Sequence, residues 1–418
     1  METIRIGIVG AGERGCYVLG SRIIEMAQEL DLQISALCDI NSQRITDAVD
    51  YLTSQAKVHQ LDWEHEIMGT TDYRALIDNP QVNAVLITTH TDNHLEPTLY
   101  ALASGKFVYL DKPISVTLDD AHRILAQEKA TGNTLIMGFT RRYEGSWKKA
   151  HELLSSGEIG ELQMMQIHSV IPYMRYYQMW HRVSAFSGGA LNDKVSHLVD
   201  VFNWMNEPGR CESVVAMGGR SSFITQRTDA PFRCSECDDA SCPYRRKCQI
   251  DDDKEGTHVL GRESWKHAVT IRDSADTCVY YPGADIIDHA IATYQYDNGV
   301  KASLFWAIYG PHAHDQETLE LVGSRGRIMV ERETGQVRVM RILDGYQKEE
   351  SYTLEVQGEY FSSSHYGADI QLLKEIHSSF HTLSHRNPVA DSSDGLESLR
   401  MIHATVDSIE EDGRRVLL

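Results

Sequence analysis

The sequence predicts an α/β protein in which a doubly wound parallel sheet of the Rossmann type precedes an α+β domain with a large open, mainly antiparallel sheet. An apolar strand at residues 4–9 runs directly into a glycine-rich turn and an amphipathic helix. Strands and helices then alternate up to about residue 138, as βαβ units do. Beyond that point several strand-like stretches alternate apolar and polar residues, which suits an antiparallel sheet with one open face.

A chain of 418 residues is long enough for two domains. We expect a first domain at residues 1–140 and a second at 141–418. An insertion at about 220–274 is rich in Arg, Asp and Cys and poor in apolar residues.

The first domain is expected to alternate strand and helix throughout. The run AVLIT at 84–88 is apolar up to its last residue, which indicates a strand buried on both faces of a parallel sheet. The other expected strands are 33–37, 107–110 and 134–137, and the expected helices are 16–30, 42–52, 95–104 and 118–131, with a helical turn at 72–77.

The second domain is expected to begin with a helix at 146–156 and a longer strand at 162–170. Further strands are expected at 213–217, 290–296, 301–307, 318–322, 327–331 and 336–342, and helices at 366–382 and 395–412.

Composition and charge exclude several classes of partner. A net charge of −20 and a pI of about 5.4 repel phosphate backbones and anionic lipid, so we expect neither nucleic acid nor membrane as a partner. No apolar run approaches the ~18 residues of a membrane span, and a core strand begins too early for a signal peptide. We therefore expect a cytoplasmic protein, in which the eight cysteines stay reduced.

The glycine turn has the pattern G-x-G-x-x-G between a strand and a helix, the context in which it binds a dinucleotide. Gly10 permits the tight turn, Gly12 lets a pyrophosphate approach the backbone, and Gly15 lets the helix pack on the strand. The helix N-terminus then offers free N–H donors to the phosphates, so Glu13 and Arg14 are expected beside the cofactor.

Asp39 ends the second strand, where a carboxylate can accept both ribose hydroxyls of the adenosine. It would repel the extra phosphate of NADP, so the sequence favours NAD. The alternative is a structural glycine turn with a solvated Asp.

Two further segments follow buried strands, and ligands bind at the carboxyl ends of such strands. Thr88, Thr89, His90 and Asn93 can contact the nicotinamide ribose, and the neighbouring His94 is either a contact or a packing residue.

Asp111-Lys112-Pro113 follows the strand at 107–110. A Lys there reaches the cofactor cleft and can stabilise a developing alkoxide. An ordinary surface Lys is the alternative.

Asp193 and His197 are four residues apart, so on a helix both side chains share one face. His197 can take a hydroxyl proton at neutral pH, although the same spacing is frequent in purely structural helices.

These segments together resemble the glucose-fructose oxidoreductase / inositol dehydrogenase (Gfo/Idh/MocA) family over nearly the whole length. The matching stretches are IGIVGAGERG, VLITTHTDNH, GKFVYLDKPIS, MGFTRRYEGSWKKAHELLSSGEIGEL, GGALNDKVSHLVDVFNWM and LVGSRGRIMV. The chain departs from the family pattern at His90, where Pro is usual, at Asp111, where Glu is usual, and at Val195, where Gly is frequent.

The resemblance implies a dehydrogenase that moves hydride between NAD(P) and a secondary hydroxyl of a sugar, glycoside or cyclitol. Carried across, Lys112 polarises the hydroxyl, His197 is the acid/base and Asp193 holds or orients the substrate. Asp111 and Arg142 match cofactor-side motifs, and Arg44 is expected over the adenine end. The resemblance also implies a homo-oligomer, a dimer or tetramer, formed through the open sheet.

Two other functions remain open at this stage. One is a glycoside-cleaving enzyme that keeps NAD bound and oxidises its substrate transiently before elimination. The other, a non-catalytic sensor, is disfavoured because Lys112 and His197 are both present.

The stretch IPYMRYYQMWHR at 171–182 places aromatic and polar side chains beside the expected cleft. Tyr176, His181 and Arg182 are the candidate substrate contacts, and an aromatic packing cluster is an equally good interpretation.

Four cysteines in the insertion, Cys234, Cys237, Cys242 and Cys248, have the spacing C-x2-C-x4-C-x5-C. Four thiolates in a short polar loop can close a tetrahedral zinc site, so we expect structural Zn²⁺, with an iron–sulfur cluster as the alternative. The remaining possibility is a reduced, solvent-facing loop. Cys16, Cys38, Cys211 and Cys278 are expected to be packing residues.

Overall fold

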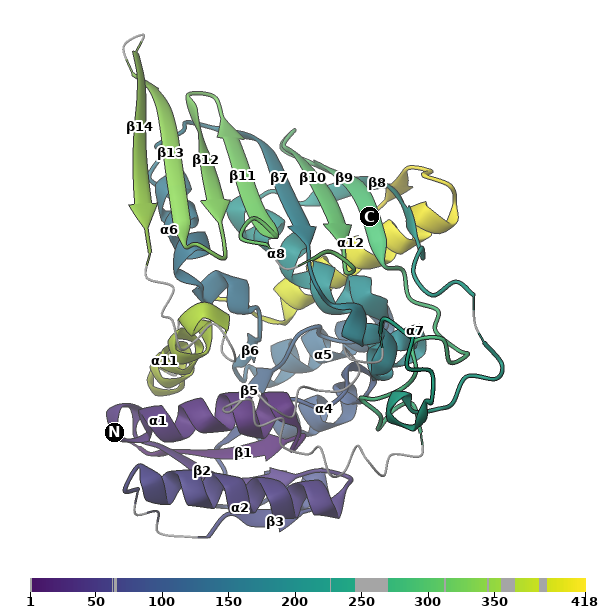
Figure 1. Cartoon of the computed structure of the whole chain (residues 1–418). Helices are drawn as coiled ribbons and strands as arrows, with labels where there is room; N and C mark the ends of the chain where they lie inside the picture. Colours follow the sequence, from purple (N-terminus) through teal and green to yellow (C-terminus); the bar gives the residue numbers. More distant parts are fainter. Residues whose placement is uncertain are drawn as a thin grey trace.

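The computed structural model describes residues 2–61, 63, 66–225, 227–244, 270–311, 313–343, 346–354, 365–382 and 389–418. In these ranges the chain forms two sheets, one in each half of the molecule, with helices between them (Figure 1). This arrangement confirms the predicted fold class.

The amino-terminal sheet has six parallel strands in the order β3-β2-β1-β4-β5-β6. The strands are β1 Ile4–Val9, β2 Leu32–Cys38, β3 Met68–Thr70, β4 Ala84–Ile87, β5 Phe107–Leu110 and β6 Leu135–Met137. The strand order reverses between β1 and β4, and ligands of doubly wound sheets bind at the carboxyl ends of strands at such a point.

Helices cover both faces of this sheet. They are the π-helical turn η1 Glu13–Gly20, α1 Ser21–Leu30, α2 Ser42–Val58, α3 Tyr73–Ile77, η2 Thr91–Asn93, α4 Leu95–Ala103 and α5 Leu118–Thr131. Asn41 caps α2 by accepting the N–H groups of Gln43 and Arg44, which fixes where that helix begins.

The carboxyl-terminal sheet has nine strands in the order β14-β13-β12-β11-β7-β10-β9-β8-β15. β7 and β10 pair in parallel, and the other neighbours pair antiparallel. The strands are β7 Leu162–Val170, β8 Cys211–Gly219, β9 His289–Tyr296, β10 Lys301–Ala307, β11 Glu317–Gly323, β12 Gly326–Glu331, β13 Gln336–Leu343, β14 Tyr346–Thr353 and β15 Val416–Leu417.

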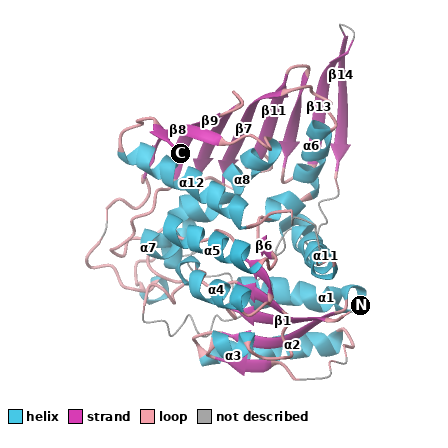
Figure 2. Ribbon diagram, turned by 180° about the vertical axis from the view of Figure 1, so that it is seen from behind, coloured by secondary structure: helices cyan, strands magenta, loops and turns pink. Residues whose placement is uncertain are grey.

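One face of this sheet is covered by helices α6 Gly145–Ser155, α8 Ser196–Met205 and α12 Ser392–Glu410 (Figures 1 and 2). The opposite face carries exposed apolar side chains. They are Met164, Val215, Met217, Ile291 and Phe305, which alternate along β7, β8, β9 and β10 with buried core residues.

A short turn, η3 Thr140–Tyr143, connects the two domains. The region predicted to contact substrate consists of further short turns: η4 Met174–Gln178, η5 Trp180–Arg182, α7 Ser184–Ser187 and the π-helical turn η6 Leu191–Val195. In the described part of the insertion, η7 Cys234–Glu236 is a short 3-10 turn.

The chain returns to the first domain near its end. Helix α11 Ala368–His381 follows the turn η9 His365–Gly367 and packs its apolar face, including Leu372 and Phe380, into the core of the amino-terminal sheet. Phe380 meets Phe107 of β5 edge to face, with 5.8 Å between ring centroids. The first domain is therefore completed by a helix from the far end of the chain.

Within the described ranges, no helix is long and apolar enough to cross a membrane.

Candidate active site at the domain boundary

The glycine turn after β1 has the geometry of a phosphate-binding turn. Gly10 has φ +105°, and a Cβ there would lie 2.7 Å from the backbone of Thr88, so a side chain is excluded. A Cβ on Gly15 would lie 2.4 Å from the Gly10 carbonyl oxygen, which shows how closely the helix packs on the strand. A Cβ on Gly12 would meet nothing within 4 Å, so open space lies over this backbone. Gly12 is also the N-cap residue of η1, so the N-terminus of this helix lies beside the open space, as phosphate binding requires.

Asp39 connects the glycine turn with the loop after β2. Its carboxylate accepts the N–H groups of Ala11 at 3.0 Å and Asn41 at 2.9 Å. The Arg44 guanidinium lies 3.8 Å from the same carboxylate. The predicted adenosine contacts Asp39 and Arg44 are thus neighbours at one end of the glycine turn.

The segment after β4 packs against both the glycine turn and the segment after β5. Thr88 donates its hydroxyl to the Gly10 carbonyl at 3.0 Å. His94 is buried, and its two ring nitrogens face the carbonyl oxygens of Pro113 at 2.9 Å and Thr89 at 3.2 Å. Through these contacts His94 links the loop after β4 to the loop after β5. The predicted cofactor contact Asn93 is exposed.

His90 lies flat against Trp180 from the second domain, with 4.2 Å between ring centroids. Burial lowers the pKa of His90 to about 4, so the ring is neutral at pH 7. This stack connects the loop after β4 with the predicted substrate region of the second domain.

Lys112 and Asp193 meet across the domain boundary. The Lys112 ammonium donates to the Asp193 carboxylate and to the Asp193 backbone carbonyl, each at 2.8 Å. The other carboxylate oxygen accepts the Tyr176 hydroxyl. Burial alone would raise the pKa of Asp193, but the Lys112 charge, the other neighbouring basic groups and the hydrogen bond from Lys112 together outweigh it and hold the pKa well below its usual range. Asp193 is therefore ionised.

His181 stands beside this carboxylate, with Nε2 3.9 Å from Asp193. Its ring stacks on Tyr176 with 4.4 Å between centroids. Burial lowers the pKa of His181 to about 3, so the ring is neutral. Tyr176 and His181 thus adjoin the Lys112–Asp193 pair.

His197 lies one helical turn after Asp193, on α8, and is buried. Burial first, and then the positive charges of Lys112 and Arg141, lower its pKa well below the usual value. Its Nδ1 has no hydrogen-bond partner among the residues that the structure describes. A neutral imidazole with an unpaired nitrogen is a suitable proton acceptor.

Three predicted site arginines have their side chains occupied elsewhere. Arg142 donates to Asp200 at 2.7 and 3.0 Å and to Asp394 at 2.9 Å, between α8 and α12. Arg182 donates to backbone carbonyls, including that of Cys278 at 2.9 Å. The roles of Arg142 at the cofactor and of Arg182 at the substrate stay predictions. Their contacts show that both side chains also join separate segments of the second domain.

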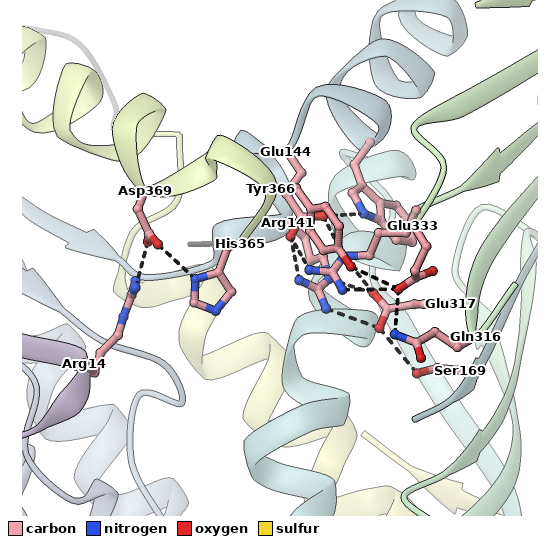
Figure 3. Close-up of polar contacts among 12 residues, drawn as sticks. Arg14, Arg141, Glu144, Ser169, Gln316, Glu317, Glu333, His365, Tyr366 and Asp369 are labelled. Atoms are coloured by element: carbon pink, nitrogen blue, oxygen red, sulfur yellow. Dashed lines mark hydrogen bonds and ion pairs between the residues drawn. The ribbon is translucent and has the colours of Figure 1, made fainter. Parts of the chain in front are cut away.

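Arg14, the third, joins the glycine turn to helix α11. Its guanidinium lies 2.7 Å from Asp369, 3.4 Å from Asp111 and 3.1 Å from the Tyr109 hydroxyl. Figure 3 shows Arg14 and His365 reaching the same Asp369 carboxylate from opposite sides. Only the backbone of Arg14 is then left for a phosphate, and Glu13 beside it is exposed.

Sequence reasoning missed several groups at this boundary: Asp369, His365, Tyr173 and Lys194. Asp369 is 355 residues from Arg14, so no local spacing could have paired them. Lys194 directly follows Asp193 in the recognised helix motif, and a second Lys there was the available signal.

The residues 270–274 after the cysteine-rich segment touch both sides of the predicted dinucleotide groove. Arg272 pairs with Asp92 after β4 at 2.9 Å and stacks over Phe186 at 4.2 Å. Asp273 lies 3.8 Å from Arg44 on α2. This segment therefore reaches from the loop after β4 to helix α2.

The cysteine cluster is described in part. Cys234 is buried, Cys237 and Cys242 are partly exposed, and Cys248 lies outside the described residues. Among the residues that are described, no three His, Cys, Asp or Glu side chains are grouped to hold a metal. In the antiparallel pairing of Arg233 with Thr277, Cys278 lies opposite Phe232 and Cys234 lies opposite Asp276. After burial, the nearby Cys234 and Cys237 thiols also raise the pKa of Cys278. The predicted packing cysteine is therefore a neighbour of the cluster.

Comparison with known families matches both domains of the chain. Residues 4–139 match the oxidoreductase family, NAD-binding Rossmann fold (GFO_IDH_MocA), and residues 151–418 match the oxidoreductase family, C-terminal alpha/beta domain (GFO_IDH_MocA_C).

Curated relatives include inositol 2-dehydrogenases. The protein of that name from Salmonella paratyphi B is 27% identical over 229 residues, 54% of this chain and 62% of the relative. That from Pseudomonas fluorescens is 31% identical over 206 residues, 49% of this chain and 54% of the relative. The matches thus span less than two thirds of the relatives' length.

Solved structures share the fold over the whole chain. The apo form of levoglucosan dehydrogenase has a TM-score of 0.76 at 16% identity, covering 100% of this chain and 99% of that one. An NAD binding oxidoreductase from Klebsiella pneumoniae has a TM-score of 0.74 at 16% identity, with the same coverage.

Proposed function

The chain belongs to the Gfo/Idh/MocA oxidoreductase family, and we propose that it is an NAD-dependent dehydrogenase acting on a secondary hydroxyl of a sugar, glycoside or cyclitol. One observation carries the proposal: Lys112 of the first domain meets Asp193 of the second at 2.8 Å, one helical turn before the neutral His197. The inositol and levoglucosan dehydrogenases among its relatives point to the same substrate class.

Each group has a distinct task in this proposal. The Lys112 ammonium polarises the substrate hydroxyl and stabilises developing alkoxide. His197 takes the hydroxyl proton, because its lowered pKa keeps it unprotonated at neutral pH. Asp193 fixes the position of Lys112 and, with Tyr176 and His181, contacts the substrate. NAD, when bound, supplies the hydride acceptor.

We assign the cofactor to the carboxyl edge of the first sheet. The phosphates would lie over Gly12, where an added Cβ meets only open space. Asp39 would accept the adenosine ribose hydroxyls and disfavour NADP, with Arg44 beside the adenine. The loop after β4, residues 88–94, would line the nicotinamide ribose.

The test uses protein stripped of bound cofactor, a panel of hexoses, glycosides and inositols, and NADH absorbance. Lys112→Ala and His197→Ala should retain NAD binding, measured by fluorescence titration, and lose turnover by about 100-fold or more. Turnover within threefold of the parent protein in either variant would overturn the assigned roles.

A second function is favoured by the segment 270–274. Its contacts with Asp92 and Arg44 would hold a bound dinucleotide in place, as an enzyme that returns its hydride requires. In that case the protein cleaves a glycoside by transient oxidation and elimination. Product sugar would form with no net NADH, whereas the dehydrogenase yields one NADH per product.

We further propose that the cysteine-rich loop binds Zn²⁺ through thiolates, with an iron–sulfur cluster as the alternative. The spacing of Cys234, Cys237, Cys242 and Cys248 supports this, and buried Cys278, near enough to Cys234 and Cys237 for them to raise its pKa, offers another thiol. Metal analysis of the purified protein, with Cys248→Ser and Cys278→Ser compared, identifies the fourth ligand. Less than 0.1 metal per chain (on the order of background) in protein purified without chelators would refute the site.

We propose that the protein is a cytoplasmic homo-oligomer, a dimer or tetramer, that associates through the open sheet. The support is its exposed apolar face, on which Met217 is 67% and Ile291 57% exposed. A reducing compartment suits its free cysteines.

A further inference from the structure

Lys194 lies between Asp193 and His197 in sequence and is partly buried at the site. Its ammonium stands 4.1 Å from the ring centroid of Tyr173 and 5.9 Å from that of Tyr176. Among the residues that the structure describes, this ammonium has no ion pair and no hydrogen bond. A cation–π contact alone leaves most of its bonding capacity unused, since an ammonium carries three donors.

A second cation lies near the same Tyr173 ring. The Arg175 guanidinium is exposed and stands 5.7 Å from the Tyr173 ring centroid. Within the described ranges it too is without an ion pair or hydrogen bond. Both charges lower the pKa of Tyr173, Lys194 more strongly than Arg175.

The neighbouring cations have carboxylate partners within ion-pair distance, unlike Lys194 and Arg175. Lys112 has Asp193, at 2.8 Å. Arg141 has Glu144 at 2.6 Å and Glu317 at 2.8 Å (Figure 3). Arg332 has Glu144 at 2.7 Å.

Lys194 and Arg175 are thus two basic groups beside the site with no carboxylate within ion-pair distance among the described residues, although Tyr173 and Asp193 act on Lys194 from further away. An oxidised nicotinamide would add a further positive charge. A neutral sugar would leave the partly buried Lys194 without a close anionic partner, whereas an anionic group could pair with Lys194 and with the exposed Arg175.

We propose that Lys194 and Arg175 form an anion subsite, so that the substrate is a polyol carrying a carboxylate or a phosphate. This inference rests on the proposed function, because it names the substrate class of the same site. Carboxylate and phosphate share the required chemistry, acceptance of charge-assisted hydrogen bonds from an ammonium and a guanidinium.

The experiment compares matched neutral and anionic ligands on the protein loaded with NAD. Glucose, glucuronate, gluconate and glucose 6-phosphate are titrated calorimetrically for Kd and assayed for kcat/KM. We expect at least one anionic ligand to bind about 10- to 100-fold more tightly than glucose, the gain typical of a charge-assisted hydrogen bond. Glucuronate and gluconate separate the carboxylate from the phosphate.

Lys194→Met and Arg175→Met should remove most of that preference and change the Kd of glucose by less than about threefold. Lys148→Met, an exposed lysine on α6, is the control and should change neither. Arg175 is exposed, so its variant remains informative even if the Lys194 variant does not fold.

Equal or tighter binding of glucose, or an equal loss for both ligands in the variants, would overturn the subsite. Anion-selective binding without NADH formation from any polyol would instead refute the dehydrogenase proposal and leave the subsite standing.

Discussion

Replacing Glu317 on β11 measures how much a buried ion cluster contributes to the free energy of unfolding. The cluster consists of Arg141, Glu144, Glu317 and Arg332. The Glu317 side chain is 3% exposed, and its carboxylate lies 2.8 Å from Arg141 and 3.6 Å from Arg332. Glu317→Gln keeps the shape and removes the charge, so these two guanidinium groups keep Glu144 as their shared close carboxylate partner. Breaking a buried pair costs about 3–5 kcal/mol, and the remaining contacts with Glu144 put the expected loss near 3 kcal/mol.

Glu320→Gln is the matched control because it lies three residues further along the same strand. Glu320 pairs with Arg327 at 3.0 Å, but their side chains are 30% and 48% exposed. A pair that solvent screens to this extent contributes about 0–1 kcal/mol.

Urea unfolding followed by tryptophan fluorescence measures both variants. Trp147 reports on the cluster, since its indole N–H donates to Glu144 at 3.1 Å. Burial alone would raise the pKa of Glu317, but Arg141 and Arg332 outweigh it and lower that pKa. The stabilisation is then complete above the unfolded-state pKa of about 4.3 and disappears as the pH falls through the lower folded-state value. A loss at pH 7 below about 1 kcal/mol, or one equal to that of Glu320→Gln, would refute this reasoning.

Four further predictions concern the domain boundary and the open sheet. Burial lowers the folded-state pKa of His90 to about 4, so the free energy of unfolding should fall as the pH drops below about 6.5, because the unfolded chain binds the proton more readily. His90→Phe keeps the stack on Trp180 and cannot be protonated, so in urea unfolding at pH 5 it should recover about 2 kcal/mol of that loss. Arg272→Ala removes the contacts with Asp92 and Phe186 and should speed NADH release about 5- to 30-fold in stopped-flow displacement; an unchanged rate would show that residues 270–274 do not retain the cofactor. Asp369→Asn should lower the free energy of unfolding by about 3 kcal/mol in urea, because Arg14 loses the buried carboxylate that joins the glycine turn to α11; a loss below about 1 kcal/mol would contradict this. Ile291→Lys on the open face should dissociate the oligomer in light scattering, and an unchanged mass would exclude that face as the interface.

The local patterns of the sequence were sufficient for most of the fold. A wholly apolar run at Ala84–Ile87 and a glycine turn after Ile4–Val9 predict buried parallel strands, and the carboxyl ends of such strands meet at one edge. That rule also brings Lys112, which follows β5, toward the predicted cleft. Periodicity therefore predicted the elements and the side of the sheet that faces the site.

The same patterns did not reveal which partners the charged residues take. Arg182 was expected to contact substrate because it stands in an aromatic, polar stretch, yet its guanidinium donates to the Cys278 carbonyl from a segment 96 residues away. Arg14 likewise finds Asp369 on a helix that the chain adds to the first domain near its end. Such contacts depend on the tertiary fold, which brings distant segments together. The spacing of residues along the sequence does not indicate which segments will meet.

The contacts that join the two domains also explain how the site keeps its geometry. Lys112 of the first domain pairs with Asp193 of the second, and both side chains are less than 15% exposed, whereas Arg14 and Asp369 pair within the first domain, which α11 completes. Separating the domains at this boundary would break the Lys112–Asp193 pair and leave two charges in a poorly solvated place, which costs several kcal/mol. α11 adds an apolar contact in the same place, because it packs into the core of the first domain. The Lys112 ammonium is thus held against Asp193 before any substrate binds, and substrate binding need not bear the free energy of assembling them.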